Sequence, residues 1–112
     1  MDNGNQQITT MDKEQAFELV RKYLILLNDH RISFEGAWVF GSFAKGNFHK
    51  DSDIDLALVI HEFADRISLQ TELLKLGRDF NYIIEPHPFS PGEFNHFHPL
   101  AHEILTYGIK VA

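Results

Sequence analysis

The sequence contains no cysteine, and no apolar stretch approaches the roughly 20 residues that a membrane-spanning helix requires. Without cysteine, the chain can form neither a disulfide nor a thiolate metal site. Residues 1–10 are polar and lack the basic and then apolar pattern of a signal peptide. We therefore expect a cytoplasmic protein that does not bind membranes.

Basic residues are also scarce. Lys and Arg total 10 against 16 Asp and Glu, so the formal net charge is −6. Proteins that bind DNA or long RNA usually present a basic face to the phosphates, and we expect no direct contact with long nucleic acid here. An acidic protein can still bind a triphosphate when metal ions lie between the two sets of negative charge.

The chain has 112 residues, of which 44% are apolar, enough for one packed core and too little for two. We expect residues 1–10 to form a flexible lead and residues 11–112 to form a single domain. Apolar spacing predicts helices over 11–29, 62–76 and 99–107. Strands are expected over 37–40, 53–60 and 80–85, the last ended by the prolines at 86, 88 and 91. This alternation favours an α/β (α+β) layer structure.

A turn between the first two expected strands carries the first chemical signal. The residues Gly41-Ser42-Phe43-Ala44-Lys45-Gly46 follow an apolar strand. Gly41 lets the backbone turn sharply and approach a ligand closely. Ser42 then opens a short helix whose free N–H groups, together with its own hydroxyl, can hold phosphate oxygens.

The second signal is the run Ser52-Asp53-Ile54-Asp55-Leu56 on the next strand. Side chains two apart on a strand project from the same face, so Asp53 and Asp55 lie about 7 Å apart along the chain. Divalent cations relieve the repulsion between such carboxylates, and Mg²⁺ commonly joins carboxylates to substrate phosphates. Either signal alone is common in turns and on solvated strands, but the two in this order favour phosphate and metal chemistry.

The combined pattern Gly-Ser-x-x-x-Gly and Ser-Asp-x-Asp-Leu resembles the signature of the DNA polymerase β-like nucleotidyltransferase superfamily. In length and ending, the chain is similar to the smallest members, the minimal nucleotidyltransferases. The resemblance implies a small mixed β-sheet flanked by helices. It also implies that Gly41, Ser42, Lys45 and Ser52 contact the nucleotide, that Asp53 and Asp55 bind two Mg²⁺ ions, and that ATP is the substrate.

The family has a third carboxylate on a later strand, which acts on the metals and as base for the attacking hydroxyl. Glu85 is our candidate for this role, with Asp79 the inferior substitute because it precedes the strand. His87 could reach the rim of the same site. Phe43 stands where many small relatives carry Arg, and we expect it to pack the short helix onto the sheet.

Three histidines near the C-terminus, His96, His98 and His102, lie outside any usual zinc motif, and we expect them on the surface near a partner contact.

Full-sized relatives add a helical domain that binds the acceptor, and this chain leaves no room for one. The resemblance to minimal members of toxin–antitoxin pairs implies that the chain transfers AMP to a tyrosine of a helical HEPN-type toxin and so acts as its antitoxin. Two alternatives stay open. The chain could neutralise a helical partner by binding alone with a degenerate site, or it could be the catalytic half of a two-subunit enzyme acting on a small molecule.

Overall fold

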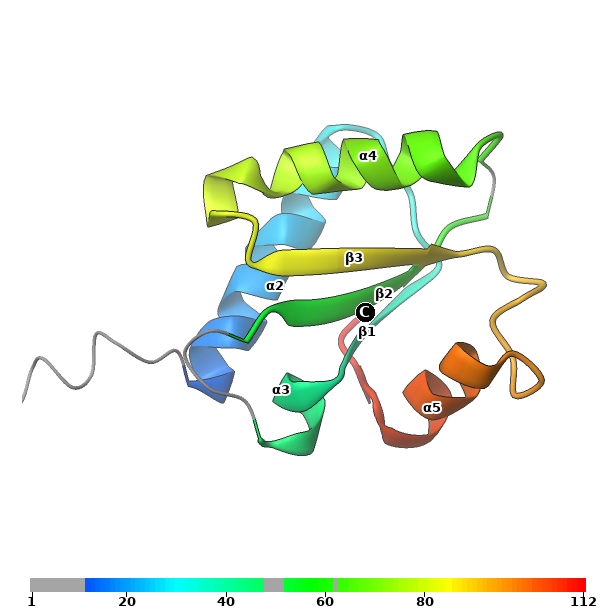
Figure 1. Cartoon of the computed structure of the whole chain (residues 1–112). Coiled ribbons are helices and arrows are strands. Elements are labelled where there is room, and N and C mark those ends of the chain that lie inside the picture. Colours follow the sequence, from blue (N-terminus) through cyan, green and yellow to red (C-terminus); the bar gives the residue numbers. More distant parts are fainter. Residues whose placement is uncertain (1–11, 48–51, 62) are drawn as a thin grey trace, which may run out of the picture.

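The protein is built on one four-stranded sheet, seen in the computed structural model, which describes residues 12–47, 52–61 and 63–112. In chain order the elements are α2 (Lys13–Asp29), β1 (Gly36–Phe40), α3 (Ser42–Lys45), β2 (Ile54–Val59), α4 (Arg66–Leu76), the 3-10 helix η1 (Gly77–Phe80), β3 (Ile84–Phe89), α5 (Pro99–Tyr107) and β4 (Ile109–Lys110) (Figure 1). The predicted flexible lead over 1–10 lies outside the described residues.

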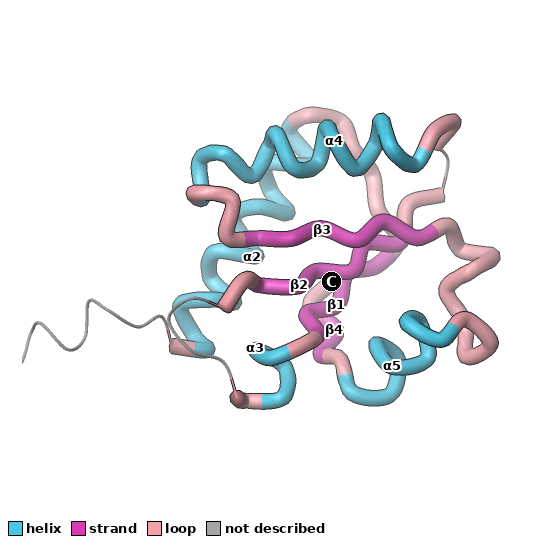
Figure 2. Tube along the Cα trace, in the orientation of Figure 1, coloured by secondary structure: helices cyan, strands magenta, loops and turns pink. Residues whose placement is uncertain are grey.

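The sheet is mixed, as the family resemblance implied. Its strand order is β3-β2-β1-β4 (Figure 2). β1 pairs antiparallel with β2 and β4, whereas β2 and β3 run parallel and are joined through α4. The short β4 was not predicted, because a strand of two residues leaves too little pattern to recognise. None of the described helices combines the length and apolar character needed to cross a bilayer.

The side chains on the two faces of β2 belong to two separate apolar clusters. Ile54, Leu56 and Leu58 belong to the main core, which α2 and α4 cover. Ala57, on the other face, belongs to a smaller cluster with residues of α5. The alternation of apolar residues along β2 therefore divides its side chains between these two clusters. Phe43 is buried in the main core and fixes α3 to it, in line with the packing role expected for this residue.

Both long helices begin at an aspartate cap. Asp12 accepts a hydrogen bond from the Gln15 amide, and the Gln15 side chain accepts one from the Asp12 amide, which completes a capping box at the start of α2. Asp65 accepts from the Ile67 amide and from the Ser68 hydroxyl. α4 consequently begins at Arg66, later than the predicted residue 62.

The third strand lies further along the chain than predicted. We expected residues 80–85, ended by the prolines, whereas β3 spans Ile84–Phe89 and contains Pro86 and Pro88. β3 is an end strand of the sheet, and the carbonyls of Ile83 and Phe89 accept hydrogen bonds from the amides of Ile54 and Ile60. With this alternation, the backbone nitrogens of the two prolines point to the outer edge of the sheet, where a missing N–H removes no hydrogen bond between strands.

Side chains of α4 occupy that outer edge. Gln70 Nε2 donates to the Pro86 carbonyl over 3.0 Å, and Arg66 donates to the Pro88 carbonyl over 2.6 Å. The edge of β3 is thus closed to further strand pairing by the helix that precedes it.

Tyr23 joins α2 to α4 in the main core. Its ring is buried, its hydroxyl donates to the Leu73 carbonyl over 2.7 Å, and burial raises its pKa above the usual range. We expect Tyr23→Phe to lower the free energy of unfolding by about 1–2 kcal/mol, because the buried carbonyl loses its donor. Urea unfolding measures this, with the exposed Tyr107→Phe as control. Equal stability of the two variants would contradict the assignment.

Candidate active site

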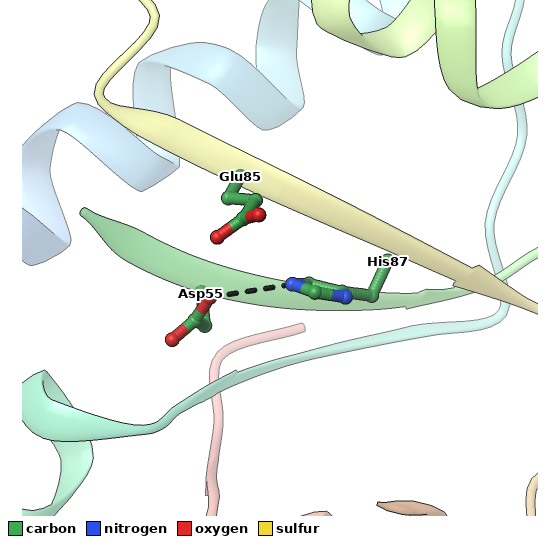
Figure 3. A group of neighbouring side chains, drawn as sticks. All are labelled: Asp55, Glu85 and His87. Carbon is green, nitrogen blue, oxygen red and sulfur yellow. Dashed lines mark hydrogen bonds and ion pairs between the residues drawn. The ribbon is translucent and has the colours of Figure 1, made fainter.

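Two carboxylates on adjacent strands form the centre of the site. Asp55 on β2 is the register partner of Glu85 on β3, and parallel pairing puts both side chains on the same face of the sheet. Figure 3 shows the two carboxyl groups turned toward each other. The structure therefore brings together two of the three carboxylates that we predicted for the site.

His87 completes a group of three potential metal ligands. Its Nε2 lies 3.3 Å from Oδ1 of Asp55 (Figure 3). One ligand atom each from Asp55, Glu85 and His87 can be chosen so that all lie within 4.8 Å of one another. We had placed His87 at the rim rather than among the ligands. The signal that could have found it is its spacing, since a residue two after Glu85 shares its strand face.

The electrostatics of the site reflect crowded negative charge. A hydrogen bond to Asp55, burial and the charge of Asp55 raise the pKa of Glu85 above its usual value. Asp53 adds to this effect, and His87 opposes it. Asp53 itself is exposed, lies just ahead of β2 and stands outside the group of three. A divalent cation would relieve the repulsion between these carboxylates.

The Gly41 turn lies directly against Asp55. Gly41 has φ 75° and ψ −147°, a conformation that favours glycine. A Cβ atom at this position would stand 2.4 Å from Oδ2 of Asp55. The glycine thus allows the backbone that opens α3 to approach the carboxylate whose other oxygen faces His87.

The remaining predicted nucleotide contacts surround this centre. Ser42 is the first residue of α3, and Ser52 lies just ahead of Asp53; both are partly buried. Lys45, at the end of α3, pairs with Glu103 of α5 over 3.2 Å, with both side chains 47% exposed. A surface pair of this kind contributes only about 0–1 kcal/mol, so Lys45 can exchange Glu103 for another anion at little cost.

Asp79, the inferior substitute for the third carboxylate, is exposed in η1, ahead of β3. The donor set of two carboxylates and an imidazole suits a divalent metal ion, since oxygen and borderline nitrogen ligands both bind such ions. Together with the Gly41 turn beside it, this donor set has the arrangement expected of an enzyme that transfers phosphoryl or nucleotidyl groups.

Comparison with known proteins agrees with that class. Residues 22–111 match the family model described as polymerase beta, nucleotidyltransferase. The chain therefore belongs to the polymerase β nucleotidyltransferase family. No curated protein sequence matches it.

Solved structures of two kinds are similar to the chain. A toxin–antitoxin structure with AMP-PNP has 25% sequence identity and a TM-score of 0.60, covering 80% of this chain and 69% of that one. A variant of the toxin–antitoxin MntA–HpeT has 25% identity and a TM-score of 0.59, covering 82% and 70%. A proposed nucleotidyltransferase from Sulfolobus solfataricus shares the fold at 16% identity, with a TM-score of 0.56 and 72% coverage of both chains.

The contact between Gly41 and Asp55 can be tested against Gly46, a second glycine with a positive φ. Gly41→Ala would force the new methyl group into the Asp55 carboxylate, whereas Gly46, at φ 82°, has no atom within 4 Å of an added Cβ. We expect Gly46→Ala to cost about 1 kcal/mol of unfolding free energy from backbone strain alone. Gly41→Ala should cost about 1–3 kcal/mol and also weaken Mn²⁺ binding. Equal metal affinity in both variants would refute this.

The raised pKa of Glu85 predicts that ionised Glu85 lowers the free energy of unfolding of the metal-free protein, by an amount that depends on pH. A carboxyl group whose pKa is higher in the folded than in the unfolded state stabilises the folded protein at pH values below its unfolded-state pKa. This stabilisation is lost as the pH rises through the folded-state pKa. In the presence of a chelator, Glu85→Gln should therefore be more stable than the native chain at pH 7, with the gain shrinking toward pH 4. Thermal unfolding across this range measures it. A gain that does not depend on pH would show that Glu85 ionises normally.

Proposed function

We propose that this chain is a metal-dependent nucleotidyltransferase that transfers AMP from ATP to a tyrosine hydroxyl of a helical HEPN-type toxin, and so acts as the antitoxin. The observation that carries the proposal is the convergence of Asp55, Glu85 and the Gly41 turn at one end of β2. Family membership and the similarity to toxin–antitoxin structures, one of them with AMP-PNP, support the choice of reaction and partner.

In this reaction the tyrosine oxygen bonds to the α-phosphorus of ATP, the bond to the bridging oxygen breaks, and pyrophosphate leaves. Asp53, Asp55 and Glu85 would hold two Mg²⁺ ions, which supply positive charge to the attacking and leaving oxygens when bound. The Glu85 carboxylate accepts the tyrosine proton.

The residues of the turn would bind the triphosphate. Gly41 permits close approach, while the Ser42 hydroxyl and the first amides of α3 donate to phosphate oxygens. Lys45 would leave Glu103 for the triphosphate or pyrophosphate. The Glu85 carboxylate lies against Asp55, which favours this catalytic role over an antitoxin that acts by binding alone with a degenerate site.

The decisive experiment uses ATP labelled on the α-phosphate, with Mg²⁺ and the protein encoded by the neighbouring gene as the candidate toxin. We expect label on the toxin from α-labelled ATP and none from γ-labelled ATP. Asp53→Ala/Asp55→Ala should reduce labelling at least about a hundredfold, because metal charge stabilisation is worth several kcal/mol. Asp79→Ala, which removes an exposed carboxylate from η1, serves as the matched control and should label normally.

Three outcomes would contradict the proposal in different ways. Binding to the toxin without label would leave an antitoxin that acts by contact alone. Label from γ-labelled ATP would indicate phosphoryl transfer instead of nucleotidyl transfer. Label on a small hydroxylated acceptor and not on the toxin would make this chain the catalytic subunit of a small-molecule enzyme.

A further inference from the structure

Packing against neighbouring residues fixes the position of His87 in the site. It lies on β3 beside Ala57 of β2, whose small side chain leaves room for the imidazole. The Phe40 ring contacts the imidazole edge to face, with ring centroids 5.0 Å apart. Only 27% of the His87 side chain is exposed. The ring is therefore oriented by packing toward Asp55, and does not project freely into solvent.

The backbone on both sides of His87 is restrained as well. Pro86 and Pro88 fix the φ angles that flank it, and their carbonyls accept hydrogen bonds from Gln70 and Arg66 of α4. A site whose ligands sit on a restrained strand is held close to one geometry. His87 thus has the rigidity expected of a ligand.

The distance between His87 and Asp55 is compatible with a shared ion. Nε2 and Oδ1 lie 3.3 Å apart, which is long for a hydrogen bond between a ring nitrogen and a carboxylate. Two ligands bonded to one ion at about 2.1 Å stand about 3.0 Å apart at a right angle and about 3.4 Å apart at a tetrahedral angle. An ion could therefore bind between these atoms with little movement of either side chain.

An imidazole ligand changes which metal a carboxylate site prefers. Mg²⁺ demands oxygen ligands and keeps its waters, whereas first-row transition metals accept imidazole readily. Asp55 and Glu85 alone would suit Mg²⁺ or Mn²⁺, and a nitrogen added to them tips the balance toward Mn²⁺.

We propose that His87 binds, through Nε2, the metal ion held by Asp55 and Glu85, and that it thereby raises the affinity of this site for Mn²⁺ relative to Mg²⁺. The proposal rests on the metal-dependent function proposed above and names a specificity residue within it. The competing role for His87 is to orient Asp55 through a hydrogen bond without touching the ion, as outer partners of metal ligands do.

The two roles differ in a spectroscopic readout that needs neither ATP nor toxin. Mn²⁺ added to the full chain at substoichiometric concentration is studied by electron spin-echo envelope modulation, which detects a ¹⁴N nucleus bonded to the ion. His96 and His102, with Nδ1 atoms 2.8 Å apart, could bind Mn²⁺ on their own. The spectrum is therefore recorded for the native chain, for His96→Ala/His102→Ala and for the same double variant carrying His87→Ala.

We expect ¹⁴N modulation in the native chain and in His96→Ala/His102→Ala, and its loss when His87→Ala is added. Calorimetric titration should show that His87→Ala lowers the ratio of Mn²⁺ to Mg²⁺ affinity at least about tenfold. Bound Mn²⁺ without ¹⁴N modulation in the His96→Ala/His102→Ala chain would overturn the proposal, and so would an unchanged affinity ratio. If His87→Ala unfolds, the spectra of the two chains that retain His87 still decide.

The outcomes also separate this proposal from the proposed function. Nitrogen-coupled Mn²⁺ in a chain that never labels the toxin would retain His87 as a ligand and reject the transfer reaction. Label transfer with an ion that shows no nitrogen coupling would retain the reaction and reject the role of His87.

Discussion

The structure depends on the parallel register that sets Asp55 of β2 beside Glu85 of β3. A hydrogen bond to Asp55, burial and the charge of Asp55 raise the pKa of Glu85, and the two carboxylates meet strong mutual repulsion when both are ionised. A proton, a nearby imidazole or a cation can each relieve it, and His87 supplies the second. Because a register shift of one residue would turn Glu85 to the opposite face, every element that fixes the alignment of β3 also maintains the site.

α4 is the element that fixes this alignment most directly. It connects β2 to β3, and its Gln70 and Arg66 side chains hold the outer carbonyls of Pro86 and Pro88. The prolines donate no backbone hydrogen bond and remove conformational freedom from the strand. Their presence on β3 is therefore compatible with pairing to β2, and it restrains the segment that carries Glu85 and His87. The α4 connection thus contributes both to the fold and to the geometry of the site.

The sequence predicted the elements whose pattern is local and long. The alternation along β2 and the spacing of α2 and α5 carry enough residues to be read directly, and the Gly41–Asp55 signature led to the family. β3 was placed too early because a proline ends a central strand and only tertiary position shows that this strand lies at an edge. His87 was left out of the ligand set for the same reason, since its neighbour Asp55 lies on another strand. Ending the predicted strand at residue 85 also hid the spacing by which His87 shares a strand face with Glu85.

The site remains compatible with a stable core because its charge is confined to one end of the strands. Beyond Asp55, the same face of β2 continues with Ala57, which packs with Phe40, Phe89 and residues of α5 in the second apolar cluster. In the part of the chain that the structure describes, no charged side chain is fully buried, and Asp55 stays 27% exposed. Solvent therefore screens the carboxylates where the apolar cluster ends. The opposite face of β2 packs into the main core, on the side of the sheet away from the carboxylates. This separation lets one strand carry clustered negative charge on one face and core residues on the other.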